Sequence, residues 1–170
     1  QSLTLLPGTL PEGDELAGVR LDAGYAYSLE RLAPNRFFVV DVHDPAHPRL
    51  LATSILNLGT IDGFEVEGGS LHTLARSGSN LTYRLYTLGE PGEIFAIPPS
   101  GSVTLSDATA SGLAVIDSVA TFLRSSGDPE TELYSFHGEA TPGAPLQSTA
   151  LPDAYCYRGT TAEIGDLFAI

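Results

Sequence analysis

The 170-residue chain repeats one pattern of apolar strands separated by turns that contain glycine or proline. Three stretches share an apolar strand, a turn and a proline-bearing return: residues 36–56, 81–97 and 131–151. A shorter element precedes each of them and begins at Gly18, Gly63 and Gly112, with spacings of 45 and 49 residues. A period of this size is typical of propellers and solenoids, in which each repeat is one structural unit.

Within these units, apolar residues alternate with polar ones, which is the two-residue period of a β-strand. Leu81, Tyr83 and Leu85 alternate in this way. Residues 37–40 are a continuous apolar run, as expected of a strand that is covered on both faces. Four strands in such a repeat match one blade of a β-propeller. The sequence therefore predicts an all-β fold of propeller-like, four-stranded repeats of about 45–49 residues.

Three full repeats and part of a fourth fit into the sequence as a single all-β domain. Their approximate bounds are 13–58, 59–106 and 107–152, with a partial repeat at 153–170. The partial repeat predicts a blade with an open edge near Ile170, and open edges expose unpaired backbone groups. We therefore expect a larger propeller or a covering protein chain. The alternatives are a four-blade ring with one three-stranded blade, a β-sandwich or another all-β fold.

The segment from Ser106 to Arg124 fits two interpretations. Leu113, Ile116 and Ala120 lie at helical spacing. Gly112 and several β-branched residues favour strands instead. Alignment with the other two copies makes strands the preferred interpretation.

The charge of the chain limits its partners. The sequence has 21 acidic and 8 basic residues, a net charge of −13 and a pI near 4.4. Because proteins that bind nucleic acid need a basic surface, we expect no nucleic-acid partner. No segment approaches the roughly 20 apolar residues of a membrane-spanning helix, so we expect no transmembrane segment. The single cysteine, Cys156, excludes an internal disulfide and a multi-cysteine zinc site.

One turn holds the densest group of possible metal ligands, namely Asp41, His43, Asp44 and His47. Their carboxylate and imidazole groups suit zinc or a hard cation. However, Asp44 precedes Pro45, and an aspartate there is typical of a turn in which its side chain accepts backbone N–H groups. We prefer the turn interpretation and predict no metal, with these four residues as weak candidates.

Motifs for catalysis are missing from the sequence. It has no His-Glu-x-x-His, no EF-hand loop, no Gly-x-Ser-x-Gly elbow and no Walker or dinucleotide-binding loop. We therefore predict no catalytic residues, no cofactor and a non-enzymatic role. The sequon Asn80-Leu81-Thr82 makes Asn80 a candidate N-glycosylation site if the protein is exported.

The run Phe-Val-Val-Asp-Val-His-Asp-Pro-Ala-His-Pro-Arg-Leu, residues 38–50, resembles the LVIVD-type repeat of bacterial and archaeal β-propellers. Residues 24–27 resemble the preceding strand of that repeat. The resemblance implies a propeller fold, an extracellular or cell-envelope location and no defined catalytic residue. It also explains Asp41 and Asp44 without a metal. The second and third copies depart from the pattern, at residues 88–91 and 136–139.

These observations predict a non-catalytic β-propeller scaffold, outside the cell or in its envelope, that interacts with other protein chains. One alternative is a ligand-binding, metal-binding or hydrolytic propeller whose site is completed by residues or chains outside this sequence. A surface or glycan-binding repeat without ring closure is a third possibility.

Overall fold

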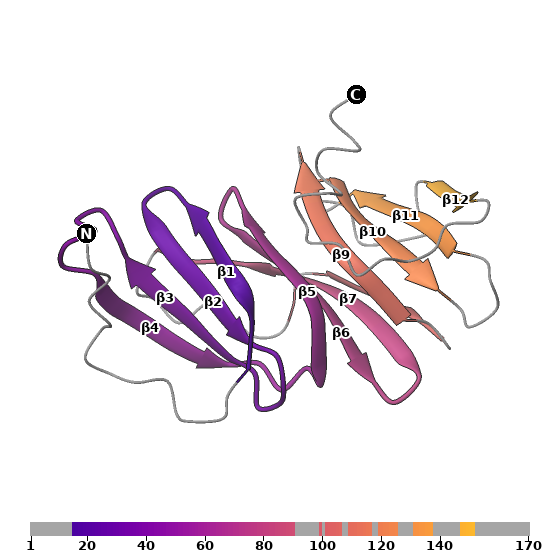
Figure 1. Cartoon of the computed structure of the whole chain (residues 1–170), viewed down its shortest axis with the longest axis horizontal. Helices are drawn as coiled ribbons and strands as arrows, with labels where there is room; N and C mark the ends of the chain where they lie inside the picture. The colour runs from indigo at the N-terminus through magenta and orange to yellow at the C-terminus, as the bar shows by residue number, and fades with distance from the viewer. Residues whose placement is uncertain are drawn as a thin grey trace.

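The computed structural model describes residues 15–90, 99, 101–106, 109–116, 119–125, 131–137 and 147–151. Every regular element in this part of the chain is a β-strand (Figure 1). The strands form three antiparallel sheets of four strands each, and neighbouring strands in a sheet are consecutive in the chain. The predicted all-β fold of four-stranded repeats is thereby confirmed.

Each sheet falls within one of the first three predicted repeats. Sheet A contains β1 (Leu16–Asp22), β2 (Tyr25–Glu30), β3 (Arg36–Asp41) and β4 (Arg49–Ile55). Sheet B contains β5 (Thr60–Glu67), β6 (Ser70–Ser77), β7 (Asn80–Thr87) and β8 (Gly101–Leu105). Sheet C contains β9 (Thr109–Ile116), β10 (Val119–Ser125), β11 (Thr131–His137) and β12 (Gln147–Leu151). The predicted partial repeat at 153–170, with its open edge, lies outside the described residues.

The segment from Ser106 to Arg124, whose sequence fits either a helix or strands, forms strands in its described part. β9 and β10 pair antiparallel, from Val119 opposite Ile116 to Ser125 opposite Thr109. Gly112 lies at a register shift in this pair and has a φ of 60°. Since residues other than glycine rarely adopt that conformation, Gly112 permits a bulge in the strand and disfavours a helix.

Short turns connect the paired strands. Ala23 and Gly24 join β1 to β2, and Gly68 and Gly69 join β5 to β6; all four have positive φ. Two central residues with positive φ are the mark of a type I′ turn, whose twist matches that of the flanking strands. The turns therefore hold consecutive strands in register.

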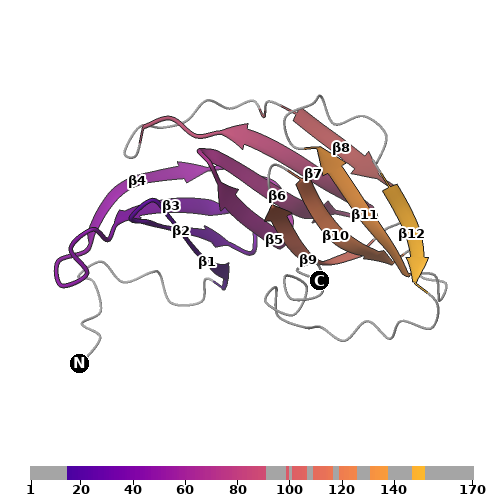
Figure 2. The same ribbon diagram turned by 90° about the horizontal axis from the view of Figure 1, so that it is seen from above.

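The three sheets stack like the blades of a propeller. The first strands, β1, β5 and β9, lie side by side, and the last strands, β4, β8 and β12, lie on the outer side of the arc (Figure 2). We call the face that a sheet turns toward the next sheet in the chain its forward face and the opposite one its rear face. Sheet B packs between the forward face of A and sheet C, and the sheets do not close into a ring within the described residues.

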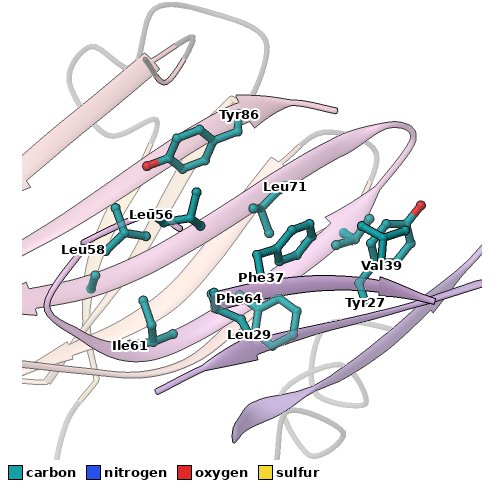
Figure 3. Packing of buried hydrophobic residues seen from close by; sticks show 12 residues of the cluster. Tyr27, Leu29, Phe37, Val39, Leu56, Leu58, Ile61, Phe64, Leu71 and Tyr86 are labelled. Atoms are coloured by element: carbon teal, nitrogen blue, oxygen red, sulfur yellow. The ribbon is translucent and has the colours of Figure 1, made fainter. Parts of the chain in front are cut away.

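The larger apolar core lies between the forward face of sheet A and the rear face of sheet B. Figure 3 shows rings and branched side chains from both sheets meeting there, together with two leucines of the connecting segment. Its buried members are Tyr27, Leu29, Phe37, Val39, Leu56, Leu58, Ile61, Phe64, Val66, Leu71, Ala75 and Tyr86. Burial of one large side chain of this kind contributes about 1.5–3 kcal/mol, so this contact is the main support for the pairing of the two sheets.

A second core joins sheets B and C. Its buried members are Leu74, Leu81, Tyr83, Leu113, Ala120 and Phe122. Here β5 approaches β9 closely: a Cβ atom on Gly63 would lie 3.0 Å from the Cβ atom of Leu113. Glycine at this position therefore sets the spacing of the inner strands.

A buried asparagine connects sheet A to the segment that leads into sheet B. Asn35 is fully buried and has a φ of 54°. Its amide oxygen accepts hydrogen bonds from the backbone N–H groups of Leu58 (2.7 Å) and Gly59 (3.2 Å). Its amide nitrogen donates to the carbonyl oxygens of Gly59 (2.8 Å), Glu30 (3.2 Å) and Arg31 (3.3 Å). One side chain thus satisfies backbone hydrogen-bonding groups at the end of β2 and in the segment between β4 and β5.

We predict that Asn35→Ala lowers the free energy of unfolding by roughly 3 kcal/mol or more, because it leaves several buried backbone groups without partners. Asn57 is a matched control, since it also has positive φ (51°) but is exposed. Asn57→Ala loses only the conformational preference, at about 1 kcal/mol. Urea denaturation of both variants measures the difference, and equal losses would contradict a linking role for Asn35.

Candidate functional site

The predicted ligand residues lie at the end of β3, which is Asp41, and in the loop from β3 to β4, and they form two separate pairs. The Asp41 carboxylate accepts the backbone N–H of His43 (3.0 Å) and lies 2.9 Å from Nδ1 of the same residue. The Asp44 carboxylate accepts the backbone N–H of Ala46 (3.0 Å) and lies 2.8 Å from Nδ1 of His47. Each aspartate thus pairs with its own histidine, two or three residues further along the chain.

These contacts stabilise the ionised carboxylates. The backbone and side-chain hydrogen bonds from His43 lower the pKa of Asp41. The His47 side chain and the backbone N–H of Ala46 do the same to the pKa of Asp44. Among the described residues, no group of three or more His, Cys, Asp or Glu side chains is arranged to hold a metal ion. The local geometry is that of an aspartate-stabilised turn.

His43 also has a packing role. Its ring covers Gly24, where an added Cβ would come within 2.4 Å of the ring, and it meets the Tyr25 ring edge-on with centroids 4.9 Å apart. Beside it, the backbone N–H of Val42 donates to the Gly24 carbonyl (3.0 Å). The loop is therefore fixed against the β1–β2 turn.

We predict that zinc leaves the stability of the chain unchanged, because no group of three or more ligand side chains in the described residues is arranged to hold the ion. Binding at a free zinc concentration about 100 times the Kd would stabilise the fold by about 2.7 kcal/mol. Thermal unfolding with and without zinc measures this. A rise in the melting temperature that His47→Ala abolishes would instead establish a metal site.

The structure describes only some of the other predicted positions. Asn80 begins β7 beside the tight turn from β6 and is exposed, while Leu81 is fully buried. The side chain is thus accessible, and its glycosylation stays a prediction. Cys156 and Ile170 lie outside the described residues.

An ion pair joins the inner strands of the first two sheets. Nε of Arg20 on β1 lies 2.6 Å from the Glu65 carboxylate on β5, and the guanidinium lies 5.2 Å from the centre of the Phe64 ring. Burial raises the pKa of Glu65, and the charge of Arg20 opposes that shift. The sequence did not single out this pair, because its partners belong to different repeats.

A buried histidine, also missed at the level of sequence, lies on the forward face of sheet B. His72 on β6 is 2% exposed, and its Nδ1 lies 2.8 Å from the Tyr83 hydroxyl on β7. Burial lowers the pKa of His72 to about 4. Burial also raises the pKa of Tyr83. The neutral imidazole therefore acts as a hydrogen-bonding part of the core.

We predict that the free energy of unfolding falls as the pH drops from about 6.5 to about 4, by up to about 3 kcal/mol from His72. In that window the unfolded chain takes up a proton at this histidine and the folded chain does not. His72→Gln should remove this part of the pH dependence, whereas His43→Gln, at an exposed site, should retain it. Chemical denaturation across this pH range provides the measurement. An unchanged slope in His72→Gln would contradict the assignment.

The rear face of sheet A carries a row of apolar side chains that is uncovered in the described structure, and an ion pair between Arg36 and Glu30 lies at one end of the same face. Register pairing aligns Leu21, Ala26, Val40 and Leu50 across all four strands of the sheet. Leu21 is 74% exposed and Leu50 is 55% exposed. Val19 and Ile55 on the same face are 54% and 51% exposed. A row of apolar side chains that crosses a whole sheet and is exposed at both edges is typical of a protein-interaction site.

The chain was compared with known proteins by sequence and by structure. No protein-family model matches it, and a search of curated proteins finds no match. Among solved structures, it is similar to a europium-containing methanol dehydrogenase, with a TM-score of 0.53 and 10% sequence identity. The match covers 78% of this chain and 25% of that one, so the chain spans about a quarter of the length of the protein it resembles.

At this level of identity, the likeness shows the fold alone. Together with the stacked four-stranded sheets, it supports a β-propeller fold that is open in the described residues. The finer resemblance to the LVIVD-type repeat stays a prediction. Among the described residues, no helix is long and apolar enough to cross a membrane.

Proposed function

We propose that this chain is a non-catalytic β-propeller scaffold that binds other protein chains. The observation that carries the proposal is the rear face of sheet A, where a row of apolar side chains crosses four strands and is exposed on the edge strands β1 and β4. In sheet B, the corresponding face is buried against sheet A. A surface of the kind that forms the core elsewhere in the molecule favours burial by a partner.

We further propose an extracellular or cell-envelope location and membership of the LVIVD-type repeats. Both rest on the resemblance of residues 38–50 to that repeat. The lack of catalytic motifs in the sequence supports the non-catalytic role. The likeness to a methanol dehydrogenase adds support for the fold and none for an activity.

We predict that the protein, isolated from its native source, has a larger native mass than its denatured chain, because partners cover the rear face of sheet A. Leu21→Glu should release those partners by placing a charge in the apolar contact. Leu32→Glu is the matched control, since this leucine is 55% exposed but lies in the β2–β3 turn. Native mass spectrometry of the tagged variants measures the outcome. The scaffold proposal fails if the wild-type protein carries no partner, or if Leu21→Glu retains all of them.

A further inference from the structure

We propose that the rear face of sheet A binds the same face of a second copy of this chain, so that two copies of sheet A pack face to face around a two-fold axis. This inference rests on the proposed scaffold function and names the partner. It follows from the arrangement of side chains on this face, which is complementary to itself in size and in charge.

Two rows of side chains cross the rear face from β1 to β4. The strand register defines them as Leu21, Ala26, Val40 and Leu50 in the first row and Val19, Ser28, Phe38 and Thr53 in the second. Neither row contains a charged residue. In both rows the side chain on β2 is small and its neighbour on β3 is larger, since Ala26 pairs with Val40 and Ser28 with Phe38. The face is therefore lower along β2 than along β3.

A two-fold axis parallel to the strands makes this difference a fit. Packed sheets keep their strands within about 30° of each other, and an axis between the sheets in that direction exchanges β1 with β4 and β2 with β3. Each row then faces its own copy in reverse order. Ala26 faces Val40 of the second copy, and Ser28 faces Phe38. Small side chains thus meet larger ones, which lets the two faces interdigitate.

At the edges of the sheet, the same axis brings the exposed leucines together. Leu21 on β1 faces Leu50 of the second copy on β4, and this contact occurs twice. The two side chains are 74% and 55% exposed in the single chain. Burial of exposed apolar surface on both edges supplies the driving force for the association.

The rear face of sheet B, which receives the forward face of sheet A, has a different pattern. Leu71 and Tyr86 occupy the positions of Ala26 and Val40, because Leu71 pairs with Val66 and Tyr86 as Ala26 pairs with Leu21 and Val40. Leu71 and Tyr86 are both large and both buried in the core against sheet A. The low line along β2 is thus a feature of sheet A, and it favours a partner with the matching ridge along β3.

The distribution of charge also favours contact through sheet A. Residues 15–55 contain five acidic and four basic side chains, a net charge of −1. Residues 56–151 contain eleven acidic and three basic side chains, a net charge of −8. A contact through sheet A therefore keeps most of the charge of −13 on each chain away from the interface. Added salt should strengthen the association by screening the remaining repulsion.

The ion pair at one end of the face has the same symmetry. Glu30 lies on β2 and Arg36 on β3, and the Arg36 guanidinium contacts the Glu30 carboxylate. Because the axis exchanges these two strands, each Arg36 lies opposite the strand that carries Glu30 and not opposite another Arg36. The pair adds no net charge to the contact, so this end of the face does not oppose the association.

The size of the face sets the expected strength of the dimer. Four strands about 4.8 Å apart and about 20 Å long cover roughly 400 Å² in plan. An interface of this size belongs with the smaller specific ones. We therefore expect a reversible dimer with a dissociation constant in the micromolar range.

Sedimentation velocity of the purified chain, from about 5 to about 500 µM, spans the expected dissociation constant and tests the inference. One chain is 17.9 kDa, so the wild type should approach 2 × 17.9 = 35.8 kDa as the concentration rises. Leu21→Arg and Leu50→Glu should each raise the dissociation constant at least about 100-fold, because each buries a charge without a partner. Leu32→Glu, in the β2–β3 turn outside the face, is the matched control and should dimerise like the wild type.

The double variant Leu21→Arg/Leu50→Glu tests the symmetry. Within one chain these positions lie on opposite edges of the sheet, about 14 Å apart, so the introduced charges do not pair there. Across the axis each introduced arginine faces an introduced glutamate of the second copy. The dissociation constant should therefore return to within about 10-fold of the wild-type value. Because a misfolded chain could not regain the dimer, this rescue separates a disrupted interface from a disrupted fold.

A wild-type chain that stays at 17.9 kDa at the highest concentration would overturn the inference. A dimer that neither single variant weakens, or that the double variant does not restore, would overturn it as well. If the purified chain is a monomer while native-source partners still depend on Leu21, the second copy is wrong and the scaffold function stands. If native-source material has no partner and the purified chain is a monomer, both fail.

Discussion

The burial of one sheet's forward face against the next sheet's rear face is the contact on which the rest of this structure depends. An isolated antiparallel sheet of four short strands has too little buried apolar surface to be stable by itself. Sheet B is covered on both sides, which explains why Leu71, Leu74 and Ala75, on opposite faces of β6, are all buried.

Two residues show how this spacing is set by opposite means. Gly63 permits close approach by having no side chain, since a Cβ atom would press on Leu113 of the next sheet. Asn35 fills its space and satisfies the backbone of the connecting segment at Leu58 and Gly59. The first acts through excluded volume and the second through hydrogen bonds that a buried backbone requires. Together they fix the inner strands and the connection between the first two sheets.

Much of the fold could be predicted from the sequence, because strand periodicity and turn residues are local signals. The alternation of Leu81, Tyr83 and Leu85 and the glycine spacing led to the strands and their grouping. The helical spacing of Leu113, Ile116 and Ala120 was misleading because β9 and β10 lie on either side of a tight turn. The His72–Tyr83 pair and the Arg20–Glu65 pair were not predictable, since each depends on which face of a strand meets which neighbour. Alternation shows that a strand has two faces but not what covers each one.

That limit also explains why the rear face of sheet A became evident only in three dimensions. In the sequence, Val19 and Leu21 look the same as their counterparts Phe64 and Val66, because all four are apolar residues in alternating strands. Their difference in exposure arises only because sheet A has no sheet behind it in the described structure. A stack built from faces of this kind has no intrinsic end, since each sheet both covers a neighbour and needs to be covered. Closure into a ring by further sheets removes both ends at once, and this physical requirement connects the repeat to assembly.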